Sequence, residues 1–183
     1  MKKLLLPALL LVIVAPFILP ACSVFRKDKE LDILFTMERA EGFVPSRQTA
    51  IWLEKPDGSF VKTLFVSEYM AYGGYLVPGI CPDWVSVSDW KNVDQEEFDA
   101  VTGATPQEGS VEMEIKIPED QLPDGEYLLL MEIHLTENFN LLARGKIRFS
   151  GEKCQSTMEV EYLPGKFHKL KKDYVSDIKV ICK

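Results

Sequence analysis

Short runs of apolar, β-branched and aromatic residues recur along most of this chain, and polar segments separate them. Runs of this kind predict β-strands. They cover residues 31–38, 49–54, 60–66, 111–117, 126–135, 143–149, 158–163 and 174–181. Pro-Asp-Gly triplets at 56–58 and 123–125 mark tight turns between neighbouring runs. Because turns return regularly and no helix of ordinary length is needed, we expect an all-β fold, an antiparallel β-sandwich.

The strand pattern breaks down between residues 67 and 99, a stretch that is rich in tyrosine, glycine and proline and contains Trp84 and Trp90. It is too long and too aromatic for a passive linker. One interpretation is a packed excursion that covers one end of the sandwich, with the two tryptophans as its core. The other is a recognition surface. The charge run DQEEFD at 94–99 predicts a solvated face or the first turn of a short helix.

The first residues have the pattern of a bacterial lipoprotein signal. Two lysines precede an apolar run at 4–19, and Leu-Pro-Ala-Cys follows, ending at Cys22. We expect residues 1–21 to be removed as a signal peptide and Cys22 to become the lipidated N-terminus. A transmembrane anchor is the alternative, but three prolines and a run shorter than a full span disfavour it. Residues 22–30 then form a short tether.

The mature chain has enough sequence for a single domain, which we expect over residues 31–183. Ser23 follows the lipidated cysteine, where aspartate would favour retention in the inner membrane. We therefore expect anchoring in the outer membrane, facing the periplasm. The net charge is −7, and loss of the two signal-peptide lysines leaves −9. Such an acidic protein repels phosphate backbones, which argues against a nucleic-acid partner.

Three cysteines remain after the lipidated one, and an odd count in an oxidising compartment allows one disulfide. Runs 158–163 and 174–181 flank a glycine- and lysine-containing loop, as in a hairpin. Folding the chain symmetrically about His168 sets Cys154 opposite Cys182. We predict a disulfide between them and a free Cys81; three buried thiols are the alternative.

The two histidines are too few and too scattered for a zinc site or a hydrolytic triad. His134 falls on the more polar side of its strand, which predicts a surface position. His168 lies in the basic loop KFHKLKK at 166–172, which we interpret as a solvated hairpin tip or, alternatively, a contact for lipid head groups or an acidic partner.

The most specific motif is Asp-Ala-Val-Thr-Gly-Ala-Thr at 99–105. It matches the D-x-x-[ST]-G-A-[ST] acceptor pattern of proteins that carry FMN covalently on threonine. At average residue frequencies the pattern arises by chance in about one chain in a thousand of this length. Thr105 would form the phosphoester, and Asp99, Thr102, Gly103 and Ala104 would complete the acceptor segment.

Residue types around this threonine suit a modified segment. Gly103 lets another backbone approach and allows a positive φ, and Ala104 adds little bulk beside the hydroxyl. The hydroxyl of Thr105 is a weak nucleophile, and no base or metal site is evident near it. A flavin transferase would therefore act in trans. The alternative is a simple turn, with Gly103 at positive φ and Pro106 stiffening its exit.

Longer segments resemble a known family in order and spacing. The hairpin at 47–67, the two tryptophans, the acceptor motif and the strand beginning DGEYLLLMEIHL resemble the periplasmic domain of unknown function 2271, over about 31–149. The same strand resembles the late strand of immunoglobulin-like domains. This resemblance implies an immunoglobulin-like fold and a link to flavin transferases and membrane redox components. Pro106, and the lack of a Trp-Asp-Gly element before that strand, depart from the family pattern.

Two functions from different classes follow from these observations. The first is a membrane-tethered carrier of covalent FMN that passes electrons between extracytoplasmic partners, with Trp84 or Trp90 shielding the flavin ring by stacking. The second is a non-redox immunoglobulin-like lipoprotein that binds a protein or a small ligand through the excursion. An independent enzyme has the least support, because no catalytic constellation is visible.

Overall fold

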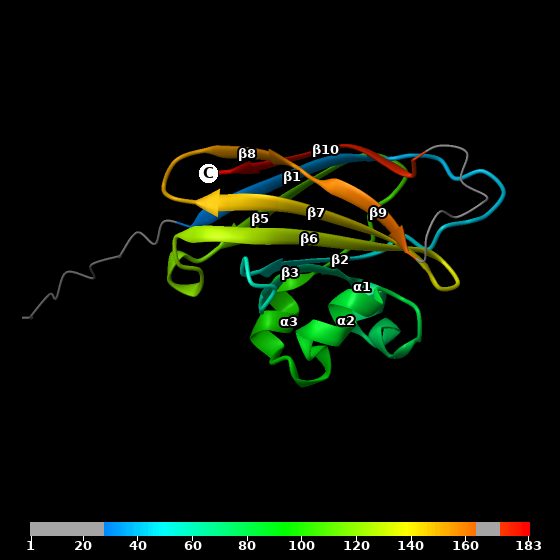
Figure 1. Ribbon diagram of the computed structural model, residues 1–183. Helices are drawn as coiled ribbons and strands as arrows, with labels where there is room; N and C mark the ends of the chain where they lie inside the picture. Colours follow the sequence, from blue (N-terminus) through cyan, green and yellow to red (C-terminus); the bar gives the residue numbers. More distant parts are fainter. Residues whose placement is uncertain (1–27, 164–172) are drawn as a thin grey trace, which may run out of the picture.

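The structure is a computed structural model that describes residues 28–163 and 173–183. The signal peptide, Cys22, most of the tether and the basic loop around His168 lie outside the described residues. Strands predominate, as predicted from the sequence, and they form two sheets. Three short α-helices lie against one of the sheets, so the described part has three layers (Figure 1).

The first sheet has four strands in the order β5-β1-β10-β8, all antiparallel. Their bounds are β1 Lys29–Met37, β5 Gly109–Ile117, β8 Cys154–Thr157 and β10 Val175–Cys182. β1 begins two residues before the expected start of the domain. Its side chains alternate between buried and half-buried along the whole strand, because one face packs on the second sheet and the other is partly solvated.

The second sheet has six strands in the order β4-β3-β2-β6-β7-β9. Their bounds are β2 Gln48–Glu54, β3 Phe60–Ser67, β4 Thr102–Gly103, β6 Gly125–Thr136, β7 Phe139–Phe149 and β9 Glu159–Leu163. β2 and β3 form the expected hairpin, in which Gly58 takes a φ of 85° in the turn. β4 pairs with β3 in parallel, and the other pairs are antiparallel.

β6 runs through the middle of the second sheet and is buried on both faces. Leu129, Met131 and Ile133 pack in the core between the sheets, whereas Leu130 belongs to a separate cluster on the outer face. A strand covered on both sides needs apolar residues at consecutive positions. This explains the long apolar run that the sequence shows here.

The outer face of the second sheet is covered by the segment that joins β3 to β4. It contains α1 Glu68–Ala71, α2 Pro82–Ser88, α3 Gln95–Val101 and the 3-10 turns η1 Gly74–Leu76 and η2 Trp90–Asn92; a third turn, η3 Glu119–Gln121, follows β5. Trp84 and Trp90 are buried against Trp52, Val66 and Leu130. The excursion is therefore packed, as one interpretation held, but it covers a face of the sandwich and not an end.

The end of the chain does not form the predicted hairpin. β8 pairs with β10 in the first sheet, but β9 pairs with β7 in the second. The chain crosses between the sheets at Met158, directly over Gly145, where a Cβ atom would lie 2.9 Å from the Thr157 carbonyl oxygen. The missing side chain at Gly145 leaves room for this crossing, and the crossing separates the two runs that were expected to pair.

Cys154 lies opposite Cys182 in the β8–β10 ladder, and the two form a disulfide with Cα atoms 4.9 Å apart. The register about His168 therefore holds for β8, although not for β9. Cys81 is free and fully buried in the helical layer. Next to the disulfide, the backbones of Glu30 and Lys183 exchange two hydrogen bonds, so the end of the chain lies beside the start of β1.

Candidate functional site

The acceptor segment begins in a short helix and ends in a short edge strand. Asp94 caps α3, since its side chain accepts a hydrogen bond from the Glu97 backbone N–H at 2.8 Å. At the other end, the backbone N–H and the hydroxyl of Thr102 both donate to the carbonyl oxygen of Phe98, the hydroxyl at 2.6 Å, and α3 ends there. The short helix expected over 94–99 is confirmed.

Gly103 is needed for a close contact and not for its backbone angle. It lies in β4 opposite Ser67 and is absent from the described residues with positive φ. The alternative of a simple turn with Gly103 at positive φ is therefore wrong. A Cβ atom at this position would come within 2.6 Å of the Phe65 ring. β4 therefore passes close to the Phe65 ring, and a larger residue at position 103 would have to displace that ring.

Thr105 follows β4 in a segment without regular secondary structure and is half-buried. The Gln48 side-chain amide donates to its hydroxyl oxygen at 3.4 Å, and the Gln107 amide donates to its carbonyl oxygen at 2.9 Å. Pro106 is buried and Ala104 is exposed. Among the described residues, Gln48 Oε1 is a buried side-chain oxygen with no hydrogen-bond partner. The acceptor threonine is thus half-buried, with its hydroxyl beside an incompletely satisfied amide.

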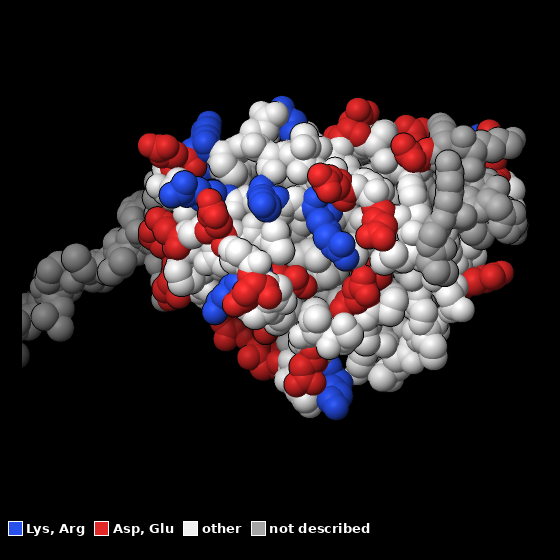
Figure 2. Space-filling model, viewed as in Figure 1, with Lys and Arg blue, Asp and Glu red and all other residues white. Residues whose placement is uncertain are grey.

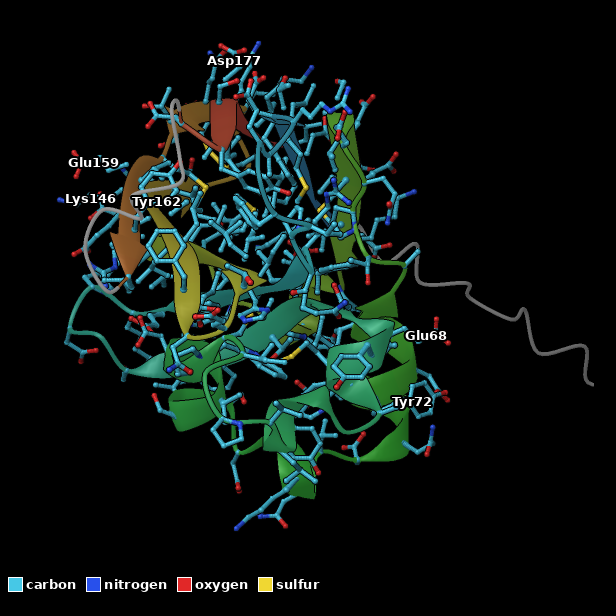
Figure 3. The ribbon with its side chains drawn as sticks, turned by 90° about the vertical axis from the view of Figure 1, so that its right-hand side faces the viewer. Glu68, Tyr72, Lys146, Glu159, Tyr162 and Asp177 are labelled. Carbon is cyan, nitrogen blue, oxygen red and sulfur yellow. A yellow bond between two sulfur atoms is a disulfide. The ribbon has the colours of Figure 1, made fainter. Side chains whose placement is uncertain are left out.

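Four residues of the motif line one hollow in the surface, of about 320 Å³. They are Asp99, Thr102, Gly103 and Ala104, and the opposite side is formed by Glu68, Tyr72 and Phe98. A second hollow of about 330 Å³ adjoins it along α1 and shares Glu68 and Tyr72. Both volumes are at the lower end for small-molecule sites. Figure 3 shows Glu68 and Tyr72 close together on the helical layer.

Aromatic rings connect this hollow to the core of the helical layer. Tyr72 meets Phe98 edge-on with ring centroids 5.0 Å apart, and Phe98 stacks on Trp90 at 5.7 Å. Trp90 packs on Trp84 at 5.2 Å. Both tryptophans are almost fully buried. The predicted shielding of a flavin by Trp84 or Trp90 is therefore wrong, because the excursion uses them as its core. The exposed ring at the hollow is Tyr72.

A buried polar cluster lies under α2, where β6 and β7 meet the helical layer. Glu132 is fully buried, and its Oε2 accepts a hydrogen bond from the Trp84 backbone N–H at 3.0 Å. Burial raises the pKa of this carboxyl to about 8, and the nearby charge of Asp83 also raises it, whereas the hydrogen bond from Trp84 lowers it. Burial likewise raises the pKa of the Cys81 thiol. The sequence pattern gave no sign of this cluster, because a glutamate in a strand is usually exposed.

His134 is buried, with 5% of its surface exposed, so the predicted surface position is wrong. It does point to the outer face of β6, but that face is covered. Its Nε2 lies 2.8 Å from the Glu137 carbonyl oxygen, which can only accept, so Nε2 carries the proton. Nδ1 then accepts from the Ser46 hydroxyl. Burial lowers the pKa of the imidazole and favours its neutral form.

A larger groove of about 1010 Å³ separates β3 and α3 from β5. Its lining includes the carboxylates of Glu96, Glu97 and Glu114 and the amine of Lys62. Burial lowers the pKa of that lysine, which donates to Gln121 Oε1 at 2.8 Å. The groove is acidic on balance. Figure 2 shows that acidic side chains also outnumber basic ones on the visible face, while the area over α1 and α2 is largely uncharged.

A family described as predicted periplasmic proteins, DUF2271, matches residues 30–162. The chain belongs to this family. The DUF2271 match contains the helical layer, the acceptor segment and the hollow, and it ends in β9, before β10 and Cys182. The expected resemblance over 31–149 is confirmed and slightly extended. No curated protein and no solved structure matches the chain.

The described part of the chain comprises residues 28–163 and 173–183. Within these ranges there is no group of three or more histidine, cysteine, aspartate or glutamate side chains placed to hold a metal ion. None of the helices in the same ranges has the length and apolar character to cross a membrane.

Proposed function

We propose that this periplasmic protein carries FMN covalently on Thr105 and works in electron transfer. The observation that supports the proposal is the common hollow of Asp99, Thr102, Gly103 and Ala104, which ends at the residue directly before Thr105. Residues of the motif are thus close in the folded structure as well as regularly spaced in the sequence. FMN would supply reversible electron transfer, while the protein supplies position and electrostatics.

Attachment requires a flavin transferase acting in trans. The Thr105 oxygen attacks the FMN-side phosphorus of FAD, the pyrophosphate P–O bond breaks, and AMP leaves. The proton of the hydroxyl passes to a base of the transferase, whose metal ion stabilises the leaving phosphate. On this chain, the Gln48 amide holds the acceptor oxygen, and exposed Ala104 leaves the approach open. Pro106 favours an extended backbone at Thr105, which suits a segment bound by another protein.

The membrane tether and the immunoglobulin-like type of the sandwich are parts of the same proposal. We infer that Cys22 is lipidated and holds the domain at the outer membrane, facing the periplasm, where extracytoplasmic redox partners would meet it. The Tyr127 hydroxyl donates to the Pro123 carbonyl oxygen at 2.8 Å, near the start of β6. Immunoglobulin-like domains have a similar tyrosine corner at the start of a late strand, which supports this fold type.

Intact-mass spectrometry of the protein co-expressed with a flavin transferase tests the attachment. We expect an increment of one FMN less one water in the wild type and in Thr105→Ser, which keeps a hydroxyl. Thr105→Ala should show no increment. The proposal fails if the wild type gains no mass, or if Thr105→Ala gains the same mass as the wild type.

The helical layer also favours a second candidate, a module that binds a protein partner without redox chemistry. Tyr69, Tyr72, Leu76 and Val77 are exposed together along α1 and η1, with 54%, 73%, 71% and 42% of their surfaces free. Exposed apolar residues that gather on one surface are typical of contact sites. Flavin absorbance in protein purified from its native host would favour the carrier; colourless protein retained by a partner would favour the module.

A further inference from the structure

We propose that the isoalloxazine ring of the Thr105-linked FMN lies against Tyr72, in the hollow between α1 and the acceptor segment. This inference rests on the proposed function and names the part of the chain that receives the ring. It assigns a role to Tyr72, which the motif does not include. It also replaces the two tryptophans, which are buried, as the aromatic contact of the cofactor.

The position of the hollow supports this site. Ala104 lines it and Thr105 is the next residue, so a phosphoester on Thr105 starts one residue from the lining, although the Thr105 side chain itself is not part of that lining. Tyr72 forms part of the opposite side and also borders the adjoining hollow along α1. A flexible ribityl chain joins the phosphate of FMN to its ring. The ring can therefore extend from the threonine toward Tyr72 without entering the core.

Tyr72 is unusually exposed for an aromatic residue, with 73% of its surface accessible to solvent. Contacts of its backbone and ring nevertheless hold it in place. Its backbone N–H donates to the Glu68 carbonyl oxygen at 3.0 Å and ends α1. Its ring meets the edge of Phe98, which is held in turn by Trp90. One face of Tyr72 is thus available to a planar ligand at little cost in side-chain entropy.

The backbone after Tyr72 keeps the surroundings of its ring clear. Gly73 has a φ of 146°, and a Cβ atom there would meet nothing within 4 Å. At Gly74 a Cβ atom would come within 2.6 Å of the Tyr69 ring. Two consecutive residues without side chains therefore leave open space on one side and let Tyr69 pack closely on the other. Together they produce the second hollow.

The charges of the hollow favour a ring over a phosphate. Glu68 and Asp99 both line it, and Asp99 is held by a hydrogen bond from the Gln95 amide at 2.7 Å. Two carboxylates repel a phosphate but accept hydrogen bonds from neutral N–H groups, such as the imide of the flavin ring. The phosphate would stay at Thr105 while the neutral ring occupies the hollow. An offset contact with Tyr72 adds to burial of the ring.

Flavin fluorescence tests the ring site, since a tyrosine in contact with an excited flavin donates an electron to it and quenches its emission. The full chain is co-expressed with a flavin transferase as wild type, Tyr72→Leu, Tyr72→Phe and Leu76→Ala. Leu76 is as exposed as Tyr72 but lines neither hollow, so it is the matched control. Emission is recorded for the folded protein and again after complete proteolysis.

We expect emission of the wild type and of Leu76→Ala to rise several-fold on proteolysis. Folded Tyr72→Leu should already emit several-fold more than the wild type, and Tyr72→Phe should do so too, because phenylalanine packs similarly but is much harder to oxidise. A lost mass increment in the wild type would overturn the attachment and the ring site together. A normal increment, with Tyr72→Leu and Tyr72→Phe quenched as strongly as the wild type, would overturn the ring site alone.

Discussion

At the scale of single residues, Glu132 has the most consequential environment in the described chain. Its carboxyl is enclosed between β6 and α2, with one oxygen bonded to the Trp84 N–H and the other, Oε1, lacking a hydrogen-bond partner among the described residues. An ionised carboxylate there has no cation to compensate the loss of water. With a pKa of about 8, Glu132 is protonated at neutral pH.

The raised pKa of Glu132 leads us to predict that the free energy of unfolding depends on pH. Its pKa is about 8 in the folded protein and 4.5 as the reference for an exposed glutamate. Between these values the folded state keeps a proton that the unfolded state releases. The stabilisation is complete below pH 4.5 and is lost as pH rises to about 8, at about 1 kcal/mol per pH unit.

Denaturant titrations at several pH values check this dependence. Glu132→Gln should flatten the decline of unfolding free energy between pH 4.5 and 8. Glu159→Gln, at an exposed position of β9, should leave it unchanged. An equally steep decline in Glu132→Gln would show that other groups cause it.

The sequence identified important residues more easily than it explained why the structure requires them. The sequence singled out Gly103, but the requirement is the nearby ring of Phe65 and not a positive φ. It placed His134 on the correct face of its strand, but nothing local indicates that another segment covers that face. In both cases the deciding neighbour is distant in sequence. Local pattern gives the direction of a side chain, whereas burial depends on tertiary packing.

At the scale of elements, the disulfide ties the short edge strand β8 to β10. β8 has four residues and pairs only with β10 within the first sheet. Closing a loop with a sequence separation of 28 removes unfolded-state entropy. On that account the bond stabilises the domain by about 3 kcal/mol.

Calorimetry with and without reductant checks the contribution of this bond. Reduction should lower Tm by about 2–4 °C for each kcal/mol lost. Cys81→Ser should keep the same sensitivity, because Cys81 is not part of the bond. Peptide mapping without reductant should join Cys154 to Cys182; a peptide pair that contains Cys81 would contradict the structure.

Strands and turns were predictable because their signals are local. The β2–β3 hairpin follows from Pro56-Asp57-Gly58 and the runs on both sides of it. The crossing from β8 to β9 could not be predicted in this way. It depends on the passage of Met158 over Gly145, a glycine of another strand, and no turn residue marks it. Runs adjacent in sequence usually pair, and here they do not.

At the scale of the whole molecule, the third layer was the part that the sequence left open. The aromatic content of residues 67–99 indicated packing, and the structure shows where that packing occurs. The four motif residues that line the hollow are close together in the sequence, so their proximity in the structure is partly a consequence of the local chain. The other side of that hollow comes from α1, some 30 residues earlier, and only the fold brings Glu68 and Tyr72 to the motif.

The length of β1 sets the distance between the acceptor segment and the start of the described chain. The strand begins at Lys29, opposite Ile117, and ends at Met37, opposite Gly109. The acceptor segment leads directly into β5 at Gly109, so it lies at the end farthest from the tether (Figure 1). Nine residues of strand correspond to roughly 26 Å.

If Cys22 is lipidated and Thr105 carries FMN, as we propose, we expect β1 to separate the two, with the cofactor toward the periplasmic space and not at the bilayer surface. Energy transfer to acceptor dyes in liposomes checks this for the lipidated protein, with a donor dye on Ala104→Cys or on Glu119→Cys. Glu119 follows β5 at the tether end and is exposed. Transfer should be weaker from position 104 than from position 119, and the reverse order would mean that the acceptor end lies on the membrane. A carrier held this way would exchange electrons with soluble partners or with the opposite membrane, and not with a protein embedded in its own leaflet.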